Sequence, residues 1–256
     1  MTLIIRIFSV TVLALLVLPI IIIVPLSFTS SSLLTLPVPG WSLKWYEEFF
    51  FSENWRVALI NSLILGTLST LLAAPLGTGA AIGLMRAPPR ARGLLAAILM
   101  LPLIVPTIIF AVSGYFAWSR LGLVNSFAGL MLGHCLISVP FMMLTVMAGL
   151  RRFDFGLMRA AASLGASPVA SYRSIFLPLM APAILGGSLL AFAISFDDAV
   201  VALFLSGPET RTLPRQLFSN VRDNLSPVVA VAAVAMTIIS ISVMGASQLA
   251  SRKRTP

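Results

Sequence analysis

Six long apolar segments dominate this chain of 256 residues and constrain what it can fold into. An α-helix rises 1.5 Å per residue, so about 20 apolar residues cross the ~30 Å hydrocarbon core of a bilayer. The segments cover residues 7–28, 57–85, 94–118, 126–150, 179–205 and 227–250. They predict an all-α membrane protein with six transmembrane helices, organised as one domain over residues 1–256.

Composition supports a lipid environment for much of the chain. Hydrophobic residues make up 59% and charged residues 10% of it, and the mean hydropathy is +1.03. A soluble domain carries about 25% charged residues. The first apolar run follows Arg6 and is too long for a signal peptide, which favours an uncleaved anchor. The 17 basic residues outnumber the 8 acidic ones, but they lie between apolar runs and do not indicate nucleic-acid binding.

The basic residues predict the orientation. If both termini are cytoplasmic, the cytoplasmic segments hold most of the basic residues and one acidic residue, Asp154. The basic residues on that side are Arg6, Arg86, Arg90, Arg92, Arg151, Arg152, Arg159, Arg173, Arg252, Lys253 and Arg254. Those on the opposite side are Lys44, Arg56, Arg120, Arg211, Arg215 and Arg222. The excess of Lys and Arg inside predicts a multi-pass membrane protein with cytoplasmic termini.

The longest cytoplasmic segment, residues 151–178, has the signals of two short helices. An Ala-rich stretch at 154–164 favours the first helix. Gly165 then suits a turn, because a side chain would obstruct it. Ser167 is a good N-cap and Pro168 suits the first position of a second helix.

We expect Pro178 to follow the second of these helices and to precede the fifth span. The result is a helix–turn–helix outside the membrane, held at both ends by spanning helices. Such an element can transmit force from a soluble partner to the bundle.

This segment resembles a family signature. Permeases of ABC importers carry a cytoplasmic loop of the form E-A-A-x3-G-x9-I-x-L-P. The matching residues here are Ala160, Ala161, Gly165, Ile175, Leu177 and Pro178. Arg159 stands where the family has Glu, which reverses one charge. The resemblance implies that this loop couples the permease to an ATPase subunit.

The chain lacks a phosphate-binding loop of its own. Its two lysines, Lys44 and Lys253, neither follow a Gly-rich turn nor precede Ser or Thr. We therefore expect no enzyme activity and no cofactor in this chain, with ATP bound by a partner subunit.

Asp197 and Asp198 lie within the fifth apolar segment. A carboxylate in hydrocarbon costs roughly 2.5–3.5 kcal/mol on insertion scales, so a polar cavity is expected to surround it. An acidic cavity suits a cationic substrate. The alternative is that one Asp caps a helix break or pairs with an arginine of another chain. On a continuous helix the two side chains point about 100° apart, so they do not serve one face equally.

His134 and Cys135 lie in the fourth segment. An interior imidazole with satisfied hydrogen bonds is the first interpretation, and a proton relay is the second. One His beside one Cys is a weak basis for a metal site, so no metal is expected.

The run from Ser195 to Pro214, SFDDAVVALFLSGPETRTLP, resembles the permeases of spermidine/putrescine importers, as does GWSLKWYEEFF near the start. The resemblance implies a type I ABC importer permease fold, MetI-like, in a bacterial inner membrane. It also implies four kinds of association: a second permease in a heterodimer, two ATP-binding subunits, an extracytoplasmic solute-binding protein, and the lipid bilayer. The implied solute is a polyamine or a related cation.

Three alternatives stay open. The substrate can be another small organic solute, such as an amino-acid derivative, an opine or a quaternary amine. An ion-coupled secondary transporter usually needs more spans and leaves the loop at 151–178 unexplained. An intramembrane enzyme lacks support, because no nucleophile–base or metal-ligand pattern is present in the sequence.

Overall fold

The computed structural model describes residues 2–223 and 225–252, which are helical along most of their length and form no β-strand. The all-α class is therefore confirmed for this part of the chain. The helices are α1 (Thr2–Ser27), α2 (Lys44–Phe51), α3 (Glu53–Arg86), α4 (Pro89–Ile104), α5 (Thr107–Arg120), α6 (Phe127–Leu150), α7 (Gly156–Ser163), α8 (Pro168–Ser171), the π-helical turn η1 (Tyr172–Phe176), α9 (Leu177–Asp197), α10 (Val200–Leu205), α11 (Leu213–Asp223) and α12 (Val228–Arg252).

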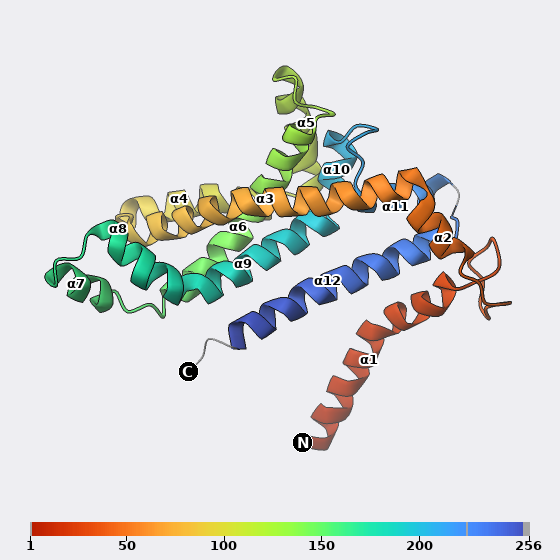
Figure 1. Ribbon diagram of the computed structural model, residues 1–256, viewed down its shortest axis with the longest axis horizontal. Helices are drawn as coiled ribbons and strands as arrows, with labels where there is room; N and C mark the ends of the chain where they lie inside the picture. The colour runs from red at the N-terminus through yellow and green to blue at the C-terminus, as the bar shows by residue number, and fades with distance from the viewer. Residues whose placement is uncertain (1, 224, 253–256) are drawn as a thin grey trace.

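Helices α3, α6 and α9 pack against one another and form the centre of the bundle (Figure 1). Small residues at steps of three or four along α3 are buried there, as a helix–helix contact face requires. They are Ala58, Ser62, Gly66, Ser69, Ala73, Gly77 and Ala81. Met142 of α6 is fully buried between two glycines. A Cβ on Gly77 would lie 2.7 Å from its side chain, and one on Gly187 of α9 would lie 2.6 Å from its sulfur.

The outer helices leave apolar side chains uncovered. Helix α1 packs only on α12 among the main helix pairs, and the apolar run at its centre is exposed. In a membrane protein such a surface faces lipid. One end of the bundle carries α7, α8 and the start of α4, and we call it the loop end; α2 lies at the other end (Figure 1).

The segment predicted as a single span at 94–118 is bent. Helices α4 and α5 meet at an angle of 100°. Val105 adopts extended dihedrals (φ −73°, ψ 130°), because the following Pro106 disfavours a helical conformation at the residue before it and has no N–H to continue the helix. Pro75 and Pro140, by contrast, lie inside α3 and α6 without ending them. Five helices are long and apolar enough to cross a membrane, or six if the bent pair counts as one.

The segment predicted at 179–205 is also divided. Helix α9 ends at Asp197, and Asp198 is extended (φ −73°, ψ 117°) before α10 begins at Val200. The prediction that both carboxylates lie on one continuous helix is therefore wrong. The alternative, that an aspartate caps a helix break, describes the local structure.

The expected end of the second loop helix at Pro178 is wrong as well. The helix continues from Pro168 through η1 into α9, as far as Asp197. In η1 the N–H of Leu177 donates to the carbonyl of Tyr172, five residues earlier. Such a wider turn accommodates the proline that follows, which has no N–H to donate.

Candidate functional site

The loop at residues 151–178, which we call the coupling loop, is built by local hydrogen bonds. Helix α7 ends in a Schellman motif, in which Ala166 N–H donates to the carbonyl of Ala161 (3.0 Å) and Gly165 N–H to that of Ala162 (3.0 Å). Gly165 has φ +83°, a conformation that favours glycine. The structure therefore explains two of the motif positions: the Ala161 carbonyl accepts the closing hydrogen bond of the motif, and Gly165 adopts its left-handed conformation.

The second half of the loop begins with a helix cap. The Ser167 hydroxyl accepts a hydrogen bond from Ala170 N–H (3.2 Å), and Pro168 occupies the first turn. The loop lies at the far end of the bundle (Figure 1). Leu164 and Val169 near its tip are 88% and 69% exposed. These two exposed aliphatic side chains mark the tip of the loop.

The remaining motif residues lie along the same element. Arg159, Ala160 and Pro178 are exposed, Leu177 is 47% exposed, and Ile175 is partly buried. The structure thus places the whole motif on one projecting element that is continuous with α9.

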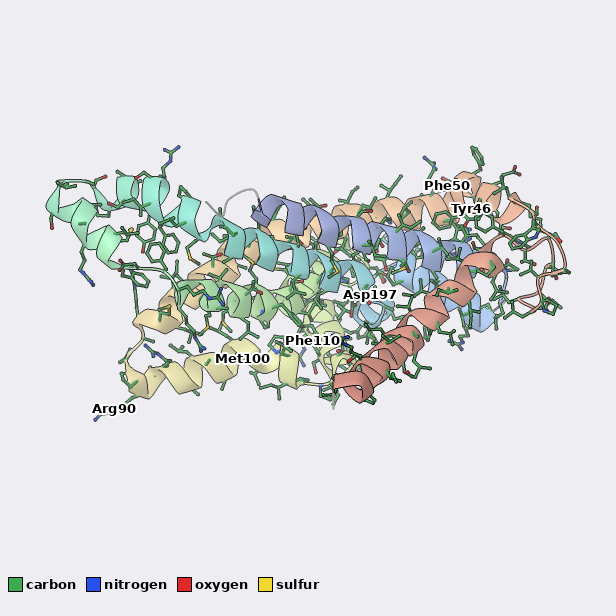
Figure 2. The ribbon with its side chains drawn as sticks, turned by 90° about the horizontal axis from the view of Figure 1, so that it is seen from below. Tyr46, Phe50, Arg90, Met100, Phe110 and Asp197 are labelled. Atoms are coloured by element: carbon green, nitrogen blue, oxygen red, sulfur yellow. The ribbon has the colours of Figure 1, made fainter. Side chains whose placement is uncertain are left out.

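The two aspartates lie in the middle part of the bundle. Figure 2 shows Asp197 between Arg90 at one end and Tyr46 and Phe50 at the other. Asp198 Oδ2 accepts a hydrogen bond from Val201 N–H at 2.8 Å, which satisfies a free donor at the start of α10.

Both helix breaks border one cavity of about 800 Å³. Thr107 follows the break between α4 and α5, and Asp197 and Asp198 form the break between α9 and α10. The residues lining the cavity are Ile20, Pro102, Leu103, Thr107, Ile137, Phe141, Ala193, Ile194, Asp197, Asp198, Ala199, Val200, Met236, Thr237, Ser240, Ile241 and Met244. Discontinuous helices commonly form substrate sites at the midplane of transporters. The lining contains two carboxylates, three hydroxyls and no basic side chain, so a cation is the ligand it suits electrostatically.

A buried histidine supports the break. His134 of α6 is fully buried, and its Nδ1 lies 3.1 Å from the Ser195 carbonyl oxygen and 3.0 Å from the Ser195 hydroxyl. Its Nε2 lies 3.8 Å from Asp198 Oδ2 and has no hydrogen-bond partner in the described residues. Only the Nδ1 atom of the imidazole has hydrogen-bond partners among the described residues, so the expectation that the ring has all its hydrogen bonds is not met. No spacing in the sequence links His134 to Asp198, because α6 and α9 meet only in the folded bundle.

An arginine organises the loop after α10. Arg215 of α11 donates from Nη1 to the Ser206 carbonyl (2.6 Å) and to the Gly207 carbonyl (3.0 Å). Burial and the neighbouring Arg211 lower the pKa of the Arg215 guanidinium. From the sequence alone, Arg215 is only a topology signal, and its contacts with the Ser206 and Gly207 carbonyls depend on the fold. Among the described residues, no group of three or more His, Cys, Asp or Glu side chains is placed to hold a metal ion.

Known transport proteins resemble this chain along most of its length. A family model described as the binding-protein-dependent transport system inner membrane component matches residues 73–255. The chain is 35% identical over 246 residues to the spermidine/putrescine transport system permease protein PotC of Haemophilus influenzae, covering 96% of this chain and 95% of that protein. It is 35% identical over 217 residues to the putrescine transport system permease protein PotI of Escherichia coli strain K12, covering 82% and 76%.

The fold is also found in solved importers. A bacterial ABC transporter involved in the import of the acidic polysaccharide alginate superposes with a TM-score of 0.71 at 15% identity, covering all of both chains. The MetNI methionine ABC transporter superposes with a TM-score of 0.63 at 17% identity, covering 80% of this chain and 100% of that one. These likenesses confirm the type I ABC importer permease fold. The chain therefore belongs to the family of inner membrane components of binding-protein-dependent transport systems, as a permease subunit of an ABC importer.

Proposed function

We propose that this permease carries a polyamine, or a closely related small organic cation, inward across the membrane. The observation that carries the proposal is the cavity of about 800 Å³ at the two helix breaks, with Asp197 and Asp198 in its lining. A polyamine bears two or more positive charges, and moving it through an apolar bundle without counter-charges is prohibitive. The relatives named for spermidine and putrescine transport support the same substrate class.

The proposed assembly has four kinds of component. A second permease pairs with this chain as a heterodimer, two ATP-binding subunits hydrolyse ATP, and an extracytoplasmic binding protein delivers the solute. The exposed tip of the coupling loop at Leu164 and Val169 supports contact with an ATP-binding subunit. The excess of basic residues at the loop end supports cytoplasmic termini and a cytoplasmic coupling loop.

Uptake by the reconstituted complex tests the substrate. Vesicles containing both permeases, the ATP-binding subunit and the binding protein should accumulate labelled putrescine or spermidine when ATP is supplied. Competition by excess unlabelled spermidine should abolish the signal, and a neutral solute of similar length should not. Accumulation of the neutral solute in preference to the polyamine would contradict the assignment.

A permease for a quaternary amine or a zwitterion is the second candidate. The apolar part of the cavity lining, which includes Phe141, Met236 and Met244, favours a ligand with methyl groups near its charge. Testing a quaternary amine as competitor in the same assay separates the two candidates.

Topology is tested independently by cysteine labelling. The one native cysteine, Cys135, is buried, so a single introduced cysteine gives a clean signal. A membrane-impermeant thiol reagent added from outside should label Ser42→Cys and leave Ser163→Cys unlabelled. Labelling of Ser163→Cys from outside would overturn the proposed orientation.

A further inference from the structure

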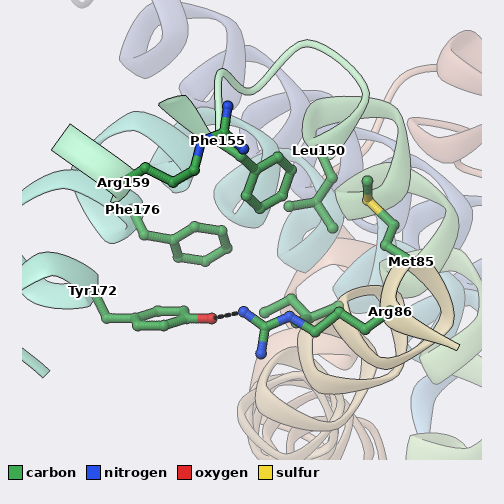
Figure 3. A pocket seen from close by; sticks show the side chains of 8 residues that line it. Met85, Arg86, Leu150, Phe155, Arg159, Tyr172 and Phe176 are labelled. Carbon is green, nitrogen blue, oxygen red and sulfur yellow. Dashed lines mark hydrogen bonds between the residues drawn. The ribbon is translucent and has the colours of Figure 1, made fainter. Parts of the chain in front are cut away.

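A pocket of about 420 Å³ opens between the coupling loop and the last turn of α3. Its lining residues are Ile82, Met85, Arg86, Leu150, Phe155, Arg159, Tyr172 and Phe176. Figure 3 shows Arg86 and Arg159 on opposite sides of the pocket, with Phe176 and Leu150 between them. The pocket therefore has an apolar centre flanked by two guanidinium groups.

Neither guanidinium has a carboxylate partner among the described residues. Arg86 donates from Nη2 to the Tyr172 hydroxyl at 2.7 Å, which fixes its direction without neutralising its charge. The Arg159 side chain has no hydrogen-bond partner among the described residues. Arg92, by contrast, donates to the Met85 carbonyl at 2.8 Å.

The nearest acidic residue in the sequence is already engaged. Asp154, which is exposed, accepts a hydrogen bond at 2.7 Å from the N–H of Gly156, the first residue of α7. It lines a different pocket, together with Arg152 and Leu157. The pocket between Arg86 and Arg159 therefore carries a positive charge that no carboxylate of the described residues offsets.

A protein carboxylate and a lipid phosphate both match this charge, and the position favours the protein. Arg159 belongs to the short helix α7, whose C-terminal end leads directly to Leu164, 88% exposed. Val169, 69% exposed, is the second residue of the next helix, α8. One protein surface that combines an apolar groove with a carboxylate can cover the tip and fill the pocket together.

We propose that this pocket receives a Glu or Asp side chain of the ATP-binding subunit, seated between Arg86 and Arg159. The inference rests on the proposed assembly with that subunit. It accounts for Arg159, which stands where the family motif has Glu, as a reversal of the charge that the permease presents to that subunit. Both arginine residues are exposed in this chain, so the pair gains strength over an ordinary surface pair when the docked subunit covers the pocket and excludes water from it. The pocket also selects this chain's own ATP-binding subunit over one adapted to Glu, because like charges would meet there.

The test measures how much ATP-binding subunit stays with the membrane-extracted permease complex, at roughly 0.05 and 0.5 M salt. Arg159→Glu should lower retention about tenfold, because it places two carboxylates together. Arg86→Gln removes one charge and should lower it by a smaller factor. Arg90→Glu is the matched control, since Arg90 is an exposed residue at the start of α4, outside both the coupling loop and the pocket lining, and it should retain the subunit normally.

Rescue identifies the partner residue. Each exposed Glu or Asp on the ATP-binding subunit is changed to Arg in turn. One of these changes should restore retention of the subunit by the Arg159→Glu permease, and the same change should weaken its retention by the unaltered permease. Equal loss with Arg159→Glu and Arg90→Glu, or no loss with either, would overturn the proposal. A retention defect seen only in vesicles with anionic lipid, and absent in zwitterionic vesicles, would assign the pocket to a lipid phosphate instead. If the unaltered chain retains no ATP-binding subunit, it is the proposed function that fails.

Discussion

The coupling loop and the acidic cavity are built in opposite ways. Each turn of the loop is determined by neighbours in the sequence, as in the bond from Ala166 N–H to the Ala161 carbonyl and the cap of Ser167 on Ala170. The cavity is determined by residues far apart, since the contact between His134 and Ser195 spans 61 positions. A substitution in the coupling loop should therefore disturb only the turn in which it lies. The loss of one buried partner at the cavity should disturb the whole site.

The largest effect is expected at the helix break. Asp198→Asn keeps the size of the side chain and an oxygen that can accept from Val201 N–H, but it removes the charge. Uptake of a polyamine should fall about 100-fold, because the proposed pairing of the substrate cation with this carboxylate would be lost, at a cost of about 3 kcal/mol. Transport of labelled putrescine by the complex measures it.

Asp197→Asn tests whether the two carboxylates differ. Asp197 ends α9 and makes no side-chain hydrogen bond to α10 in the described residues, so its loss should affect uptake without disturbing the break. Thr237→Val, which changes an uncharged member of the same lining, should alter uptake less than either. Normal transport by the double variant would make the pair structural and remove the chemical support for a cationic substrate.

The next effect is expected at the turn of the loop. Gly165→Leu forces a side chain into a left-handed conformation at φ +83°, at a cost of about 1–2 kcal/mol. We expect about a tenfold loss of ATP hydrolysis stimulated by the loaded binding protein, with membrane insertion unchanged. Gly165→Asn should retain most of the activity, because asparagine tolerates this conformation. Equal activity of the Leu and Asn variants would show that the backbone turn does not matter.

A smaller effect is expected at the imidazole behind Asp198. His134→Asn keeps a donor for the Ser195 carbonyl and removes the Nε2 that faces Asp198. Uptake should fall about fivefold, which corresponds to about 1 kcal/mol for a buried polar contact. Ser138→Ala is the control, because it removes another buried bond between α6 and α9, to the Ala191 carbonyl, without touching Asp198. Similar losses in both variants would reduce His134 to a packing role.

The smallest effect is expected at the cap of α8. Ser167→Ala should destabilise the first turn by about 1 kcal/mol and speed hydrogen exchange at the Ala170 amide about fivefold. Ser163→Ala removes a hydroxyl bonded to the Arg159 carbonyl and no cap, so exchange at Ala170 should not change. Faster exchange that spreads from Ser167→Ala to the middle of α9 would contradict the local character of the loop.

The sequence predicts the loop well and the cavity poorly, for a physical reason. Gly165, Ser167 and Pro168 act through backbone preferences that operate within one turn. The position of the breaks depends on the rest of the bundle, since Pro106 ends a helix whereas Pro75 and Pro140 do not. The presence of two carboxylates in an apolar segment indicated a polar cavity. A helix break capped by one aspartate was an open alternative, but its place at Asp198 and the position of His134 beside that carboxylate depend on the fold.

The helix that leaves the coupling loop at Pro168 and reaches Asp197 is continuous over 30 residues, with the π-helical turn η1 near its start. Its longest part, α9, has 21 residues and is about 32 Å long at 1.5 Å per residue, with the acidic pair at its far end. If the loop docks an ATP-binding subunit as proposed, α9 is a lever arm between the docked subunit and the cavity. A tilt of about 7° at its base would displace Asp197 by about 4 Å, which is close to the width of an aliphatic chain. The stroke needed to open or close the path of a slender cation can therefore come from a rotation too small to unseat the loop itself.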